Sequence, residues 1–326
     1  MARAPHETAW ALSAESIDEL FEDALRSQGE RAFAQRIDQI CALSRYALWN
    51  AFLISVQRPG AVAVASAREW RERYLRGIIP GARAIVILQT FGPVRFVYDL
   101  EDTTGPDFQG QPADLFKAVI RGLRFVDEAS LEALSDTAAK KDAILIRRED
   151  FGTNLAGQAA AVLHAAESGR TVGSSKKNVA FVVSLARRLE PAQALATLAH
   201  ELAHIYCGHL GRPILIDSKT KKPKPISWSD RRGVLTVSQR EFEAEATAYL
   251  VCRRIGIETR SADYLAGYLS EADRHHVSYA TIIRAAARIE GLMPRSLAPV
   301  TIKHTEASPS QRELFPSSHA WTVQVP

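Results

Sequence analysis

The stretch PAQALATLAHELAHIYCGH, residues 191 to 209, is the part of the chain that most strongly indicates a fold. Pro191 suits the first position of a helix, and Gly208 suits the position just past its end, so we predict a helix from Pro191 to Cys207. Its apolar residues recur at helical spacing: Leu195, Leu198, Leu202 and Ile205. This pattern predicts a helix whose apolar side is buried in a core.

The same helix carries the motif HELAH. Because His200 and His204 are four residues apart, they project from one face, roughly 5 to 6 Å apart at Cβ, and both imidazoles can bind one metal ion. Glu201 then lies beside the fourth coordination position, where a water molecule needs a base. The alternative is a pair of surface histidines on a helix. The motif predicts a zinc-hydrolase site with one Zn²⁺ per chain.

A catalytic zinc ion needs a third protein ligand, which we expect from SQREFEAEATAYLVC, residues 238 to 252. Glu241 and Glu245 share a helix face, whereas Glu243 points elsewhere. We predict that Glu241 binds the metal and that Glu245 accepts a hydrogen bond from a histidine ligand. The alternative is that Glu245 is the third ligand.

The start of this second helix bears on Glu241. Ser238 and Glu241 have the spacing of a capping box, which would occupy the Glu241 carboxylate at the helix end. Thr236 and Gln239 have the same spacing and could cap the helix instead. The sequence does not decide between these two capping boxes.

A hydrolase also needs a donor for the developing oxyanion. The candidates near the motif are Tyr249, His209, His275 and His276. Cys207 could reach a metal ion, but a thiolate would take the position that catalysis needs open. We therefore expect Cys207 to be buried and inert.

Length and composition favour a soluble protein of two domains. The chain has 326 residues, 46% of them hydrophobic, and a formal net charge of +4, which permits an acidic partner without requiring one. Its three cysteines are far apart, so we expect no disulfide framework. No stretch approaches the roughly 18 uninterrupted apolar residues of a membrane span. These features predict a cytoplasmic protein without membrane contact.

The order of elements predicts an α+β fold. Helices are expected over 16 to 56, followed by a β-hairpin formed by ARAIVILQT (82 to 90) and VRFVYDL (94 to 100). Strands over 143 to 147 and 179 to 184 should flank a further helix. We place a domain boundary near 138 and a disordered, proline- and serine-rich tail over 298 to 326. The expected domains are 1 to 138 and 139 to 297.

The second domain resembles the ImmA/IrrE metallopeptidases, a small gluzincin-like group. The resemblance rests on TLAHELAHIYCGH (197 to 209) and EFEAEATAYLVCRRIGI (241 to 257). It implies that His200, His204 and Glu241 bind zinc, that Glu201 is the base and that Glu245 supports a ligand. It further implies a zinc endopeptidase that cleaves a regulatory protein, such as a repressor.

The first domain is similar to the amino-terminal domain of ArdC-type antirestriction proteins. The similarity covers SRYALWNAFLISVQRPGAVAVASAREW (44 to 70), PGARAIVIL (80 to 88) and FVYDLEDTTG (96 to 105). The residues that fill the pattern are Asn50, Gln57, Pro59, Trp70, Gly81, Asp99 and Thr103. The basic linker usual before the glycine is here the apolar RGIIPG (76 to 81).

That similarity implies an alternative function, an antirestriction protein that binds single-stranded DNA and whose zinc site is structural or secondary. Such binding needs cations for phosphates and aromatic faces for bases. The candidate contacts are Arg68, Trp70, Arg71, Arg73 and Tyr74. The competing interpretation is that the aromatic residues belong to the core and the arginines to a solvated face.

A short peptide in the tail indicates one further partner. It resembles the pentapeptide by which bacterial proteins dock on the replication sliding clamp, and it consists of Gln311, Arg312, Glu313, Leu314 and Phe315.

Overall fold

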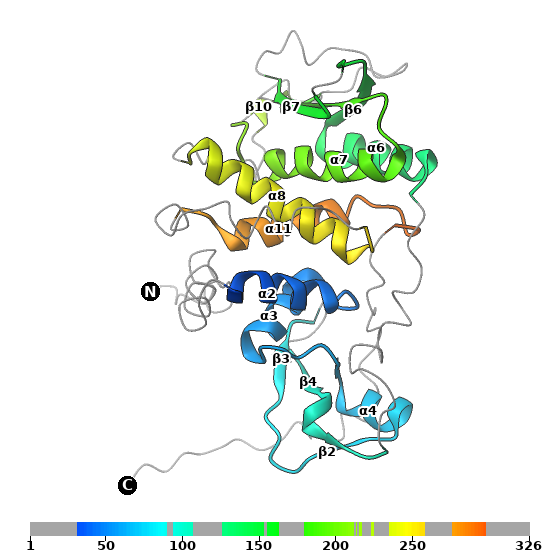
Figure 1. Ribbon diagram of the computed structural model, residues 1–326, viewed down its shortest axis with the longest axis vertical. Coiled ribbons are helices and arrows are strands. Elements are labelled where there is room, and N and C mark those ends of the chain that lie inside the picture. Colours follow the sequence, from blue (N-terminus) through cyan, green and yellow to red (C-terminus); the bar gives the residue numbers. More distant parts are fainter. Residues whose placement is uncertain are drawn as a thin grey trace, which may run out of the picture.

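The computed structural model is a mixed α+β protein (Figure 1). It describes residues 31–89, 94–106, 126–152, 155–162, 179–211, 213, 215–216, 223–224, 235–257 and 276–297. The expected tail and its pentapeptide lie outside these residues. The described helices are α2 (Arg31–Ala42), α3 (Leu48–Gln57), α4 (Ala67–Tyr74), α6 (Glu128–Asp142), α7 (Pro191–Tyr206), α8 (Val237–Arg254) and α11 (Tyr279–Glu290), with a 3-10 turn, η1, over Leu100–Asp102.

The amino-terminal half contains the predicted hairpin. Strands β3 (Ile85–Ile87) and β4 (Arg95–Asp99) pair antiparallel, and β1 (Val64–Ala65) pairs with the other side of β4. A separate two-stranded sheet joins β2 (Gly77–Ile78) to β5 (Thr103–Thr104). The prediction of a hairpin is thus confirmed.

Two side-chain amides on α3 pair with the strand β3 and the residue that follows it. The Asn50 amide donates to the Leu88 carbonyl at 3.0 Å and accepts from the Leu88 N–H at 2.9 Å. The Gln57 amide pairs with Val86 in the same way, at 2.7 and 2.9 Å. These contacts satisfy backbone groups that an edge strand otherwise offers to another chain.

The second half is built on a three-stranded sheet in the order β6-β8-β7. Strand β6 (Ile144–Glu149) is parallel to β8 (Phe181–Ala186), and β7 (Gly157–Ala161) is antiparallel to it. The two predicted strands are present, but the expectation of a helix between them is wrong for 157–161, where β7 lies. The residues on its half-buried face, Gly157, Ala159 and Ala161, are small and let the strand approach α7. Residues 163–178 lie outside the described part.

A further pair joins β9 (Leu215–Ile216) to β10 (Pro223–Lys224).

Helices α7, α8, α11, α2 and α3 stack in layers between the two three-stranded sheets (Figure 1). α7 lies against β7 and β8, α8 and α11 follow, and α2 and α3 connect this stack to the β1-β4-β3 sheet. One hydrophobic cluster runs through all these layers, from Phe52 to Leu198. The expected boundary at 138 falls inside α6, where Ala138 is fully buried in that cluster.

Arg254, at the end of α8, joins the two halves. Its buried guanidinium donates to the carbonyls of Ile40 (3.2 Å) and Tyr46 (2.8 Å) and pairs with Glu290 at 2.6 Å. A buried charge is tolerated only when it is paired and hydrogen-bonded, so this geometry holds α2, α8 and α11 together. Among the described helices, none is long and apolar enough to cross a membrane.

Candidate metal centre

The helix that carries HELAH forms as predicted. Pro191 is its first residue, the Glu190 N–H is capped by the Gln193 side chain at 3.2 Å, and Gly208 follows the end with a φ of 78°. The last helical residue is Tyr206, one residue earlier than expected. Because Leu198 and Leu202 point into the core, the histidines lie on the opposite part of the helix, partly accessible.

The cap of α8 leaves Glu241 free for another role. The Thr236 hydroxyl accepts from the Gln239 N–H at 3.2 Å, and the Gln239 side chain accepts from the Thr236 N–H at 2.9 Å. This reciprocal pair is a complete capping box. The alternative cap formed by Ser238 and Glu241 is therefore wrong.

Three potential ligands meet where α7 and α8 pack together. The Nε2 atoms of His200 and His204 are 3.2 Å apart, and the Glu241 carboxylate lies 3.4 Å from the first and 3.6 Å from the second. The 3.4 Å distance ends at Glu241 Oε2 and the 3.6 Å distance at Oε1, and one ligand atom from each residue lies within 4.8 Å of the others, which is close enough for all three to bind one ion after small side-chain shifts. The donor set, two imidazoles and one carboxylate, also suits zinc.

Glu245, one turn further along α8, contacts the other side of His200. Its Oε2 atom is 3.0 Å from His200 Nδ1, the nitrogen that points away from the triangle. Such a carboxylate holds the ring and leaves Nε2 to face the metal. The geometry favours Glu241 as the third metal ligand and Glu245 as the residue that orients His200.

The charges of the metal-free triangle are strongly coupled. Burial lowers the pKa of His200, but hydrogen bonds to Glu241 and Glu245 outweigh it and raise that pKa to about 9. Hydrogen bonds from His200 and His204 hold the pKa of Glu241 well below its usual range. A proton thus sits among these groups at neutral pH, where a divalent cation would replace it.

Glu201 lies beside the triangle and against the edge of the sheet. Burial raises the pKa of its carboxyl, and the Ala159 backbone donates a hydrogen bond to it. Gly157 of β7 faces it so closely that a Cβ there would come within 3.1 Å of Glu201 Cγ and Oε1. A buried carboxylate with a raised pKa is suited to accept a proton from water.

His209 occupies a place that the sequence did not predict. Its Nδ1 is 3.0 Å from His204 Nδ1, and its Nε2 is 3.0 Å from Glu243 Oε2. Both nitrogens therefore face protein groups rather than the open side of the triangle. The turn at Gly208 brings His209 back against α7. This glycine was the sequence feature from which the contact could have been predicted. Glu243, which the helix periodicity set aside, is fully buried there.

The other oxyanion candidates lie elsewhere. The Tyr249 hydroxyl donates to Asp38 Oδ1 at 3.0 Å, and burial raises its pKa to about 12. His276 is exposed, and His275 lies outside the described residues. Cys207 is buried, as expected, with its thiol 3.9 Å from the Thr247 hydroxyl.

The candidate DNA contacts on α4 do not form a stacking platform. Trp70 is fully buried, and its Nε1 donates to the Tyr98 carbonyl at 2.9 Å. Tyr74 is half-buried against it, with ring centroids 5.1 Å apart. Arg68 pairs with Glu72 at 2.9 Å, while Arg71 and Arg73 are exposed. Trp70 is thus a core residue, Tyr74 packs at the edge of its cluster, and the arginines form a solvated face.

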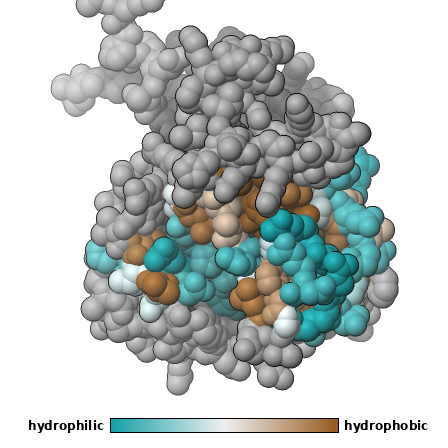
Figure 2. All heavy atoms as spheres, turned by 90° about the horizontal axis from the view of Figure 1, so that it is seen from above, coloured by the Kyte–Doolittle hydropathy of each residue, from teal (hydrophilic) through white to brown (hydrophobic). Residues whose placement is uncertain are grey.

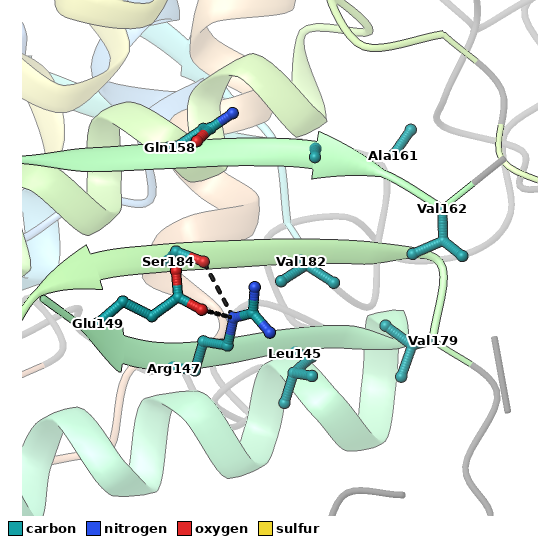
Figure 3. Close-up of a pocket in the computed structure, with 10 residues that line it drawn as sticks. Leu145, Arg147, Glu149, Gln158, Ala161, Val162, Val179, Val182 and Ser184 are labelled. Carbon is teal, nitrogen blue, oxygen red and sulfur yellow. Dashed lines mark hydrogen bonds and ion pairs between the residues drawn. The ribbon is translucent and has the colours of Figure 1, made fainter. Parts of the chain in front are cut away.

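A pocket also lies on the second half, away from the triangle. It is formed by the face of the β6-β8-β7 sheet that points away from α7, and Arg147 crosses it to reach Ser184 at 3.0 Å and Glu149 at 2.7 Å (Figure 3). Seen from this end of the molecule, the described surface is a mixture of hydrophobic and hydrophilic patches (Figure 2). None of the candidate metal ligands lines this pocket.

Comparisons of the chain with models of protein families, with curated proteins and with solved structures found no match.

Proposed function

We propose that the protein is a zinc-dependent endopeptidase. The observation that supports this best is the triangle of His200, His204 and Glu241, which brings one ligand atom from each residue within 4.8 Å of the others, with Glu201 beside it. Three protein ligands leave one position for water or substrate, as catalytic sites require. A structural site usually has four protein ligands, which disfavours that alternative.

Bound zinc would supply Lewis acidity, which polarises a carbonyl and makes a water molecule more acidic. The chain's own contribution is proton transfer. Glu201, with its pKa raised by burial, accepts the proton of the attacking water at a carboxylate oxygen and delivers it to the leaving amine. Glu245 holds His200 through Nδ1 and leaves its Nε2 facing Glu241, where it would be available to the ion.

The resemblance to ImmA/IrrE metallopeptidases adds the substrate class, a regulatory protein such as a repressor. Single-stranded DNA binding receives less support, because the Trp70 ring, which was expected to stack on a base, is buried. Exposed arginines such as Arg71 and Arg73 would still give weak, salt-dependent binding to any polyanion.

The test is metal analysis together with one isosteric variant. Purified protein should carry about one zinc per chain and cleave members of a proteome-derived peptide library, as followed by mass spectrometry. Glu201→Gln should keep the zinc and lose cleavage, because only the proton acceptor is removed. Absence of zinc in the wild-type protein, or full cleavage by the Gln variant, would contradict the proposal.

A further inference from the structure

The second metal ligand has a support of its own, formed by residues far apart in the sequence. His204 Nδ1 lies 3.0 Å from His209 Nδ1, His209 Nε2 lies 3.0 Å from Glu243 Oε2, and Glu243 Oε1 accepts the Ser278 N–H at 2.8 Å. The chain of contacts thus runs from the triangle to the N-terminus of α11. Its middle is fully enclosed, since the His209 and Glu243 side chains are 1% and 0% exposed.

We propose that His209 and Glu243 are positioning residues that hold His204 for metal binding through one defined direction of hydrogen bonding. The proposal rests on the proposed function, because it requires a metal ion on His204 Nε2. A neutral imidazole that binds through Nε2 carries its proton on Nδ1. His209 Nδ1 must then accept, so the proton of His209 is on Nε2 and is donated to Glu243.

Glu243 sets this direction because a carboxylate has two acceptor oxygens and no donor. One oxygen receives His209 Nε2–H, and the other receives the backbone N–H of Ser278, the N-cap of α11. The two histidines therefore have different supports. His200 contacts the Glu245 carboxylate directly, whereas His204 contacts His209, which in turn contacts the Glu243 carboxylate.

A second interpretation uses the same residues. Cys207, His209 and Glu243 offer three ligand atoms within 4.8 Å of one another and could hold a separate ion. The two interpretations exclude each other, because an ion bound by His209 Nε2 and Glu243 Oε2 would replace the 3.0 Å hydrogen bond that the support of His204 requires. Two zinc ions per chain, with one lost in Cys207→Ser, would establish the separate ion and overturn the proposal.

Glu243→Gln is the decisive variant. Glutamine has the same shape but only one acceptor oxygen, while two N–H groups, from His209 and Ser278, point at the two ends of this side chain. If its NH₂ faces His209, that ring must carry its proton on Nδ1, opposite the Nδ1–H of His204. We expect zinc affinity, measured by competition with a chelator, to fall about 10- to 100-fold.

Replacements of His209 separate positioning from simple packing. Asparagine places its amide oxygen near the position of Nδ1 and can still accept from His204, whereas leucine cannot. We expect His209→Asn to retain more zinc affinity than His209→Leu, although both remove the partner of Glu243. In the leucine background, Glu243→Gln should cause little further loss of affinity, since the connection is already broken.

A spectroscopic readout tests the direction itself. In zinc-loaded protein with ¹⁵N-labelled histidine, His209 should be the tautomer with its proton on Nε2, and Glu243→Gln should remove or reverse that state. Wild-type protein without zinc would overturn both this proposal and the peptidase. Two outcomes would overturn this proposal alone. The first is one zinc per chain bound with equal affinity by the wild type and by Glu243→Gln. The second is a wild-type His209 that carries its proton on Nδ1.

Discussion

Gly157 on β7 and Glu201 on α7 are so close that a methyl group on Gly157 would lie 3.1 Å from both Cγ and Oε1 of the glutamate. The strand reaches this position because its inward residues are small. The absence of a side chain at 157 therefore leaves the Glu201 carboxylate its place beside the metal ligands.

The first prediction concerns this contact. In Gly157→Ala the new Cβ would also meet Thr197 Cγ2 at 2.6 Å, so the strand or the helix must shift. We expect zinc to stay bound and cleavage to slow roughly 10- to 100-fold, because a catalytic group displaced by about 1 Å can cost about 100-fold. Zinc content and initial cleavage rates measure the two effects.

Thr197→Ser provides the control for this prediction, because it removes Cγ2, the atom in the closest contact. The double variant should regain thermal stability relative to Gly157→Ala and stay slow, since the contacts with Glu201 remain. Recovery of the full rate in the double variant would show that Glu201 is insensitive to Gly157.

The second prediction separates the two glutamates of α8. Glu241 faces the Nε2 atoms of both histidines, whereas Glu245 contacts Nδ1 of His200. Glu241→Ala should abolish stoichiometric zinc binding. Glu245→Ala should retain one zinc with affinity reduced about 10- to 100-fold. Chelator competition distinguishes them, and the reverse order would identify Glu245 as the ligand.

The third prediction is a pH dependence of zinc uptake. The pKa of His200 in the metal-free protein is raised from 6.5 to about 9, so this ring is protonated at neutral pH and must lose its proton when zinc binds. Apparent affinity should rise with pH by up to about tenfold per unit between pH 6.5 and 9. Calorimetry at pH 7.5 in two buffers of different ionisation enthalpy should detect close to one proton released by His200.

The raised pKa of His200 also predicts that the stability of the metal-free protein falls as the pH rises, whereas its zinc affinity increases. Because the folded pKa lies above the unfolded value, the protonated His200 stabilises the metal-free fold fully below pH 6.5, and this contribution is lost as the pH rises through about 9. Urea midpoints of the metal-free protein should fall over that range. His200→Gln should flatten this part of the curve, and an unchanged slope would contradict the assignment.

The fourth prediction concerns Asn50 and Gln57. Replacing both by alanine removes four hydrogen bonds to the backbone of Val86 and Leu88. These contacts are exposed, so we expect a loss of about 0.5 to 1.5 kcal/mol for each amide, measured by urea unfolding. Light scattering should also increase with concentration, because the edge of β3 becomes open to another chain. Equal scattering by variant and wild type would refute the protective role.

Local patterns in the sequence determined the elements that carry the candidate site. The HELAH helix, with proline at its start and glycine past its end, and the spacing of His200 and His204 depend on contacts within a few residues. The hairpin of β3 and β4 was predictable for the same reason. Competing local patterns were not resolved, because Ser238 with Glu241 and Thr236 with Gln239 have the same spacing.

Only the tertiary structure decided how these elements meet. The packing of α7 on α8 brings Glu241 to both Nε2 atoms and directs Glu245 to Nδ1 of His200. The same packing buries Glu243 against His209, and burial of Trp70 removes it from the surface. Periodicity reports which face of a helix a residue occupies. It does not report which residue on another helix that face will contact, because this depends on the packing of side chains distant in the sequence.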